Sequence, residues 1–216
     1  MRHETPGLQS RSTLGSPPRL KRFHHGSLKQ ALLDAALVAP DIEGLSLNQL
    51  AAGLGVTPAA IYRHFASRED LLGEVASIGF DRLEARFAAV FDIDRSPASA
   101  TDARARLEGL AHAYLEFADD EPALWQLMFG SQAAAYRATA QPLARRNSYE
   151  YLPAALLGLH RCGVVARAPD GRDALFAWSA IHGVAMLRAG RVPAALGPVS
   201  DLAHDLATRV ARALQS

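Results

Sequence analysis

Signals for helix starts and ends recur along this chain, whereas signals for β-strands are nearly absent. Ser27 and Ser46 are each followed three residues later by a glutamine, which is the spacing of a capping box at a helix start. Thr57 precedes Pro58, and proline is favoured at the first position of a helix. Few β-branched residues alternate with polar ones, and no Asn-Gly or Asp-Gly turn links two strand-like runs. These signals predict an all-α protein.

Apolar residues recur at helical spacing between the caps, as in Leu47, Leu50 and Leu54. Gly55 follows this run, and glycine is common just beyond a helix end. Pro153 is expected to interrupt or kink a later helix. The expected helices, about nine in all, are 28–39, 47–54, 58–65, 68–91, 102–118, 122–130, 142–162, 170–189 and 200–214, with 131–140 a short helix or a loop.

The composition is that of an ordinary globular protein with a sizeable core. Its net charge is only +1, so total charge says nothing for or against a polyanionic partner. Cys162 is the single cysteine, which excludes an intramolecular disulfide and any CxxC site and fits a reducing cytoplasm, where we expect the protein to be. No secretion signal and no apolar run near the length of a membrane span occur, so we expect no membrane partner.

Composition and capping together suggest a division of the chain. Residues 1–20 are rich in Ser, Pro, Gly and Arg, and we expect a disordered basic arm there. Residues 21–72 hold three short helices, and a connecting helix continues to about residue 91. Residues 98–216 form the remaining helical part.

The two short helices on either side of Gly55 form a helix-turn-helix pattern. Small residues at Thr57, Ala59 and Ala60 would let the start of the second helix approach a phosphate or a base edge closely. Ile61 and Phe65, four residues apart, are expected to face the core together. An ordinary surface helix turning a corner would also explain capped short helices in series.

At this point the stretch 27–72 resembles the DNA-binding domain of the tetracycline-repressor (TetR) family of bacterial transcription regulators. The resemblance is carried by Gly55-Val56-Thr57, by Ile61-Tyr62-Arg63-His64-Phe65 and by Arg68-Glu69-Asp70-Leu71-Leu72. It departs from the family pattern at Pro40-Asp41, where the first helix ends, and at Arg68, where lysine is usual.

The resemblance implies a role for each matching residue. Phosphate contacts are implied for Ser46, Thr57, Tyr62, His64 and Arg68, and proximity to the bases for Ala59, Ala60 and Arg63. The basic arm would place Arg19, Lys21 and Arg22 near the minor groove, or leave them merely solvated.

The C-terminal part resembles the WHG subclass of this family through the run Trp178-Ser-Ala-Ile-His182-Gly183 and the stretch 114–130. The resemblance implies that this part binds a small, hydrophobic effector and forms a homodimer through its last two helices. Candidate ligand contacts are His112, Phe117, Trp125, Met128, Phe129, Asn147, Tyr151, Trp178 and His182. An apolar stripe of this kind is equally typical of a packed core, and His182 of a structural histidine.

Two other classes of function compete with a regulator. An all-α enzyme would need a nucleophile, a base and an orienting group, but His160 and Cys162 lie two residues apart and do not share a helix face. No HExxH motif or carboxylate cluster occurs, so we expect no metal, no cofactor and no catalytic residues. A membrane-surface or interaction module would leave the helix-turn-helix unexplained.

The motifs and the resemblance therefore predict a transcription regulator that binds a palindromic double-stranded DNA operator as a dimer. Whether it represses or activates is not written in the sequence, and the resemblance implies repression as the family default. In this hypothesis an effector in the C-terminal part changes the tilt of the connecting helix and releases the DNA.

Overall fold

The computed structural model describes residues 25–133, 146–190 and 197–215, and within these ranges it contains nine helices and no strand. The all-α class expected from the sequence is confirmed. In chain order the helices are α1 His25–Leu37, α2 Leu47–Leu54, α3 Pro58–Ile61, α4 Arg68–Val90, α5 Ala100–Asp120, α6 Pro122–Phe129, α8 Arg146–Arg161, α9 Gly171–Ala189 and α10 Val199–Ala213.

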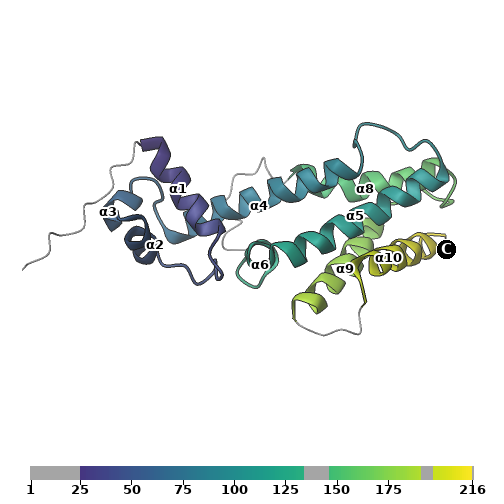
Figure 1. The fold of residues 1–216 in the computed structure, drawn as a ribbon. Helices are drawn as coiled ribbons and strands as arrows, with labels where there is room; N and C mark the ends of the chain where they lie inside the picture. The colour runs from purple at the N-terminus through teal and green to yellow at the C-terminus, as the bar shows by residue number, and fades with distance from the viewer. Residues whose placement is uncertain (1–24, 134–145, 191–196, 216) are drawn as a thin grey trace, which may run out of the picture.

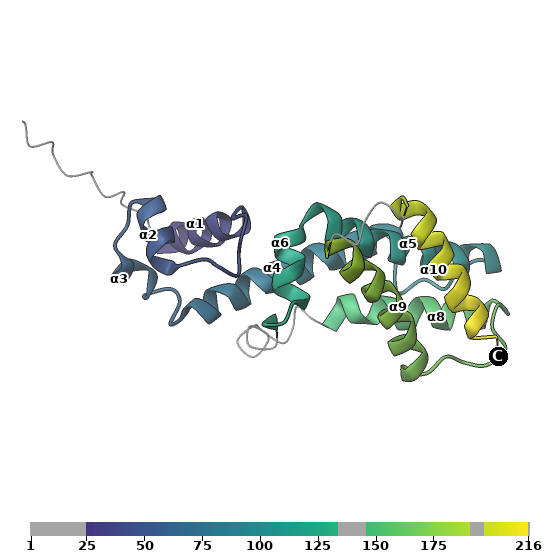
Figure 2. The same cartoon turned by 90° about the horizontal axis from the view of Figure 1, so that it is seen from below.

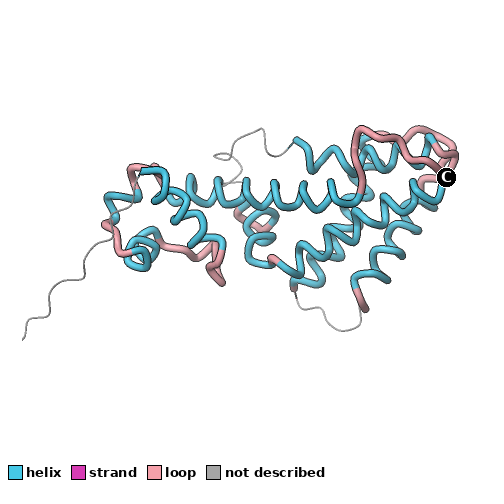
Figure 3. Tube along the Cα trace, turned by 45° about the horizontal axis from the view of Figure 1, so that its top comes forward, coloured by secondary structure: helices cyan, strands magenta, loops and turns pink. Residues whose placement is uncertain are grey.

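The helices form two groups joined by the long helix α4. Helices α1, α2 and α3 gather around the first turns of α4 at one end of the elongated molecule (Figure 1). Its later turns run into a bundle made by α5, α6, α8, α9 and α10, and the view turned by 90° shows the same separation (Figure 2). In the tube drawing, helices make up most of the described chain (Figure 3).

Several helix starts differ from those expected from the sequence. Helix α1 begins at His25, so Ser27 lies inside its first turn. Ser46 occupies the residue before α2 with an extended backbone, but its side chain makes no capping hydrogen bond, so the expected capping box is not formed. Helix α10 begins at Val199 after Pro198, which places Ser200 inside the helix. These starts lie within about three residues of the expected ones, close to the usual scatter of helix boundaries.

The caps of α4, α5 and α9 are formed by side chains. Ser67 and Asp70 make a reciprocal capping box at the start of α4. Ser99 caps α5, so this helix begins earlier than the expected Asp102. Asp170 caps α9 as expected and accepts hydrogen bonds from two backbone amides there. These bonds pair amides that a helix start would otherwise leave without a partner.

Two expected segments and the arm lie partly or wholly outside the described residues. Of the segment expected at 131–140, only 131–133 are described, and the helix expected from residue 142 is described from Arg146. Pro153 lies inside α8, which continues through it to Arg161. The arm 1–20 falls wholly outside the described ranges, and the domain boundaries inferred from the sequence stay predictions.

One hydrophobic core runs continuously along α4 from the α1–α3 group into the bundle. Leu71 and Leu72 pack with α1 to α3, while Phe80 and Phe87 belong to the same buried cluster further along the helix. At Gly79 the helix approaches α6 so closely that an added methyl group would overlap the side chain of Met128. Close-packed interiors transmit displacement, so a shift of α6 would be passed to α4.

Candidate nucleic-acid interface and ligand cavity

The turn between α2 and α3 is formed by local backbone preferences. Gly55 ends α2 with φ of 67°, the left-handed conformation that glycine adopts without a steric penalty. Thr57 has an extended backbone and Pro58 starts α3. Ile61 and Phe65 are almost completely buried, as expected from their spacing, and hold this segment to the core.

The side chains that the resemblance assigned to DNA lie mostly on the solvent side of this segment. Thr57, Ala59, Tyr62 and Arg63 are exposed, and 56% of the Tyr62 surface is accessible. Ala60 is half-buried and packs against the core, so less of its surface faces solvent. The ordered helix is also shorter than expected, since residues 62–64 form a turn after α3.

Tyr62 and Arg68 line a surface groove between the start of α2 and the start of α4. The groove also contains Ser46, so three of the residues implied to contact phosphate come together there. Amide groups at helix starts favour anions, and both helices begin at this groove. Its lining comprises Gly44, Leu45, Ser46, Leu47, Asn48, Tyr62, Ala66, Ser67, Arg68 and Glu69.

Arg68 is partly engaged within the protein. Its Nε donates a hydrogen bond to the Leu45 carbonyl oxygen at 2.7 Å, which ties the start of α4 to the loop before α2. One of its terminal nitrogens lies 3.7 Å from the Glu69 carboxylate. Arg68 therefore positions the groove, and only part of its hydrogen-bonding capacity is left for a phosphate. The residues Arg19, Lys21 and Arg22 lie outside the described residues.

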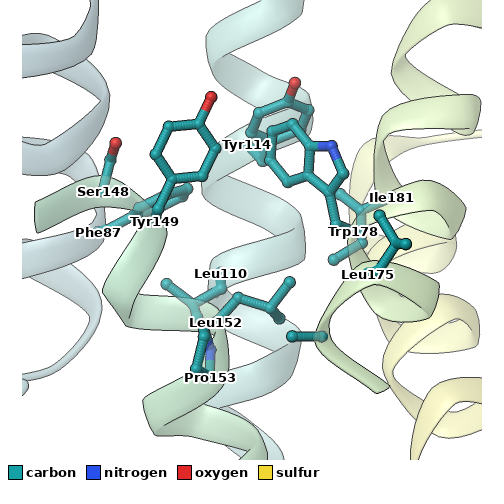
Figure 4. Close-up of a pocket in the computed structure, with 11 residues that line it drawn as sticks. Phe87, Leu110, Tyr114, Ser148, Tyr149, Leu152, Pro153, Leu175, Trp178 and Ile181 are labelled. Carbon is teal, nitrogen blue, oxygen red and sulfur yellow. The ribbon is translucent and has the colours of Figure 1, made fainter. Parts of the chain in front are cut away.

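A second hollow lies inside the bundle, between α5, α8 and α9. It is a cavity of about 350 Å³ with walls that are almost entirely apolar (Figure 4). The hydroxyl oxygens of Ser148, Tyr149 and Tyr114 lie toward one end of it in this view, and Leu110, Leu152 and Pro153 lie toward the other (Figure 4). The full lining comprises Phe87, Leu110, Tyr114, Ser148, Tyr149, Leu152, Pro153, Ala174, Leu175, Trp178 and Ile181.

Of the nine ligand contacts expected from the sequence, Trp178 is the one that lines this cavity. Phe117, Trp125 and Met128 are fully buried in the core, which is the alternative that the sequence left open. Tyr151 is also buried and packs against Phe87 and Phe91.

The remaining expected contacts lie elsewhere. His112 pairs with Glu116 one turn further along α5. Phe129 packs between Trp178 and Phe80 of α4 and lies behind the cavity wall. The side chain of Asn147 falls outside the described residues.

His182 belongs to a buried hydrogen-bond network behind the same wall. Trp125 Nε1 donates to the Tyr114 hydroxyl oxygen at 3.1 Å, and that hydroxyl lies 2.8 Å from His182 Nδ1. The indole can only donate, so the Tyr114 oxygen accepts from Trp125. The Tyr114 hydroxyl can then donate its own proton to the unprotonated Nδ1 of a neutral histidine. Burial lowers the pKa of His182 and raises the pKa of Tyr114, so both groups stay uncharged near neutral pH.

Sequence reasoning missed most of the cavity wall. Tyr114 and Leu110 lie four residues apart on α5, and this spacing alone marks a shared helix face. Ser148 and Tyr149 carry no comparable signal, because they meet α9 only through the tertiary fold.

Two kinds of site are absent from the described ranges. Residues 25–133, 146–190 and 197–215 contain no group of three or more His, Cys, Asp or Glu placed to hold a metal ion. Within the same part of the chain, no helix has the length and apolar character needed to cross a membrane.

Comparison with known families identifies the family of the chain. Residues 32–75 match the family described as bacterial regulatory proteins, tetR family, and residues 107–214 match the tetracyclin repressor-like C-terminal domain. The chain belongs to the TetR family. Members of this family are transcription regulators and not enzymes, so the enzyme alternative is dropped. The WHG subclass stays a prediction, because the matching C-terminal family does not carry that name.

Solved structures of two similar proteins share this fold. A structure of a protein of unknown function from Rhodococcus sp. RHA1 is 31% identical, with a TM-score of 0.70 over 90% of this chain and 98% of that one. The regulator PfmR from Thermus thermophilus has a TM-score of 0.60 over 85% of this chain and 97% of that one, but at 19% identity it supports the fold alone.

One curated relative is named as a repressor. The HTH-type transcriptional repressor KstR2 of Mycobacterium tuberculosis is 28% identical over 121 residues. This match covers 56% of the present chain and about half, 54%, of the repressor.

Proposed function

We propose that this TetR-family regulator is a repressor that binds a palindromic DNA operator as a homodimer and leaves it when a hydrophobic small molecule enters the bundle. The observation that carries the proposal is the shared groove at the starts of α2 and α4, beside the exposed face of α3. Similarity to a repressor supports the direction of regulation.

The DNA contacts follow from the position of each side chain. Ser46, Thr57, Tyr62, His64 and Arg68 would contact phosphates, since hydroxyl, imidazole and guanidinium groups all donate to phosphate oxygens. Ala59, Ala60 and Arg63 would lie nearest to the bases. Arg63 is exposed, and no ion pair holds its side chain within the described residues. A free guanidinium is the side chain best suited to bidentate contact with guanine.

The homodimer would form through α9 and α10. The outward face of α9 carries Leu175, Phe176, Met186 and Leu187, all of them large apolar side chains that are exposed in the single chain. Contiguous exposed apolar surface of this kind marks an interaction site. A second copy of the same face would bury it, and four helices from two chains would then pack as a bundle.

The effector would act through α6 and α4. Trp178 of the cavity wall touches Phe129 of α6, and Phe129 touches Phe80 of α4, with ring centroids 5.6 and 5.5 Å apart. A ligand that displaces Trp178 would therefore favour another position of α6 against Gly79. Since α4 also carries the groove residue Arg68, this displacement would alter the spacing of the two DNA-binding units.

Footprinting of the DNA beside the protein's own gene tests the proposal. We expect a protected palindrome whose half-sites lie about one helical turn apart. Binding to this DNA should be lost when a hydrophobic small molecule occupies the cavity. Absence of any protected sequence at low salt would sink the regulator proposal.

Arg63→Ala separates a base contact from a phosphate contact. We expect operator affinity to fall by about 5- to 150-fold, with little change in binding to unrelated DNA. Replacing Tyr62 and His64 together by alanine should instead weaken binding to both DNAs. The matched control is Arg161→Ala, an exposed arginine at the end of α8. Equal losses on operator and unrelated DNA for Arg63→Ala would remove its base-reading role.

A further inference from the structure

The cavity between α5, α8 and α9 has two properties that restrict its occupant. Its described lining contains no Lys, Arg, His, Asp or Glu. Its polar side-chain atoms are three hydroxyl oxygens and the indole nitrogen of Trp178, which lie toward one end, while aliphatic side chains lie toward the other end (Figure 4). A ligand held by this described wall would meet no opposite charge from it and would find its side-chain hydrogen-bonding groups toward that end.

Ser148 is a buried side chain of this wall with hydrogen-bonding capacity to spare, and the more exposed Tyr149 and Trp178 share that capacity. Only 6% of the Ser148 surface is exposed, and this residue lines the cavity. Within the part of the chain that the structure describes, its hydroxyl makes no hydrogen bond. Because Ser148 lines the cavity and its hydroxyl has no partner among the described residues, a ligand that supplies a partner gains affinity. The Tyr114 hydroxyl, by contrast, is already bonded to Trp125 and His182.

The other walls favour a flat ring. Tyr114 and Trp178 meet edge to face with centroids 5.1 Å apart, and Tyr149 approaches Trp178 at 5.9 Å. A ring inserted among these three would make further aromatic contacts of the same kind. The volume of about 350 Å³ lies at the lower end of the range for small-molecule sites, which fits a ligand of one to a few rings.

We infer that this cavity binds an uncharged, ring-containing molecule with a hydroxyl or carbonyl group at one end, which pairs with Ser148, and that it rejects carboxylates. The inference rests on the proposed function, in which the cavity is the effector site. It adds the chemical class of the effector. An ionised carboxylate would lose its hydration without gaining a cation, and this penalty exceeds the gain from ring contacts.

Three matched probes test the class on the full chain. 2-Naphthol is uncharged at neutral pH, 2-naphthoate is ionised, and 2-methylnaphthalene has no hydrogen-bonding group. We expect calorimetric titration at pH 7 to rank 2-naphthol first and 2-methylnaphthalene second. We expect 2-naphthoate to bind at least about 100-fold more weakly than 2-naphthol. Preference for 2-naphthoate, or no binding of any probe, would overturn the inference.

Ser148→Ala tests the hydrogen bond itself. We expect the affinity for 2-naphthol to fall by about 3- to 10-fold, while that for 2-methylnaphthalene is unchanged. The control is Ser77→Ala, because Ser77 lies on α4 outside the cavity wall and donates its hydroxyl to the Gly73 carbonyl in the same helix. Equal affinities of Ser148→Ala and the unaltered protein for 2-naphthol would remove Ser148 from the site.

The titrations are made without DNA, so they test the chemical class of the ligand independently of operator binding. Loss of operator binding with intact 2-naphthol binding would refute the regulator and leave the chemical class of the cavity. Operator binding that persists when no naphthalene probe enters the cavity would refute the class of ligand alone.

Discussion

The two hollows of this molecule are built from the chain in opposite ways. The groove beside α3 draws on residues 44–69, a single short stretch, and its key side chains are exposed. The cavity in the bundle draws on α4, α5, α8 and α9, whose contributions span residues 87–181, and several of its side chains are buried. A site made by one stretch can be inferred from local signals, whereas a site made by distant helices depends on how those helices pack.

Trp125 and Trp178 give the largest expected difference between core and cavity wall, and the sequence analysis named both as ligand contacts. Trp125 is completely buried, and we expect Trp125→Ala to lower the free energy of unfolding by about 3–5 kcal/mol. Trp178 is half-buried at the cavity, and we expect Trp178→Ala to cost about 1–2 kcal/mol while reducing 2-naphthol binding more than tenfold. Urea unfolding and calorimetric titration measure the two effects.

Equal losses of stability in the two tryptophan variants would contradict the division between core and cavity wall. The same conclusion would follow from a Trp125→Ala protein that keeps its stability and loses only the ligand.

The same contrast explains which parts of the fold could be predicted. The turn at Gly55, the start at Pro58 and the burial of Ile61 and Phe65 follow from local rules of backbone conformation and i, i+4 spacing. These rules placed most of the helices within a few residues. They do not say which of two apolar faces meets another helix.

The differences between the expected ligand contacts and the observed cavity wall have this physical origin. Phe117 and Trp125 share the apolar, aromatic character of Trp178, and only packing against α4 and α9 separates core from wall. Ser148 shows the reverse case, because a serine within a helix gives no signal until the fold buries it beside a cavity. Ala60 is half-buried against the core, and a small side chain of this kind suits both an exposed surface and a close packing contact.

Gly183 tests the proposed interface between two copies of the bundle. A side chain at this position would meet no other atom of the single chain within 4 Å, and the position lies on the same outward face of α9 as Phe176. We expect Gly183→Leu to leave the helical content unchanged and to weaken the dimer by about 5- to 150-fold, because overpacking a helix contact costs about 1–3 kcal/mol. Sedimentation over a range of concentrations measures the dissociation.

The matched control for this substitution lies in the other helix group. Gly53 of α2 also faces open space, so Gly53→Leu should leave the dimer intact. Gly183→Leu protein that stays as dimeric as the Gly53→Leu control would move the interface away from this face of α9.

His182 gives the smallest expected effect and concerns the network that backs the cavity wall. Burial lowers its pKa below the ordinary value of 6.5, so at pH values between the two the unfolded chain binds a proton that the folded chain does not. Stability is therefore fully present above pH 6.5 and falls as the pH falls toward the folded value, by at most about 1.4 kcal/mol for each pH unit because one proton is involved. Protonation would also reverse the bond to Tyr114, because Nδ1–H of the charged ring would donate to the hydroxyl oxygen.

Urea unfolding at pH 7.5, 6.5 and 5.5 measures this dependence above the range in which ordinary carboxylates titrate. We expect His182→Gln to lose part of the pH slope, whereas His112→Gln, which alters the surface pair with Glu116, serves as the control. Identical slopes for the unaltered protein and His182→Gln would show that His182 does not resist protonation in the fold. The bundle would then tolerate a charge behind the cavity wall. The groove beside α3 lies at helix starts, which favour anions. The electrostatic difference between the two hollows would then disappear.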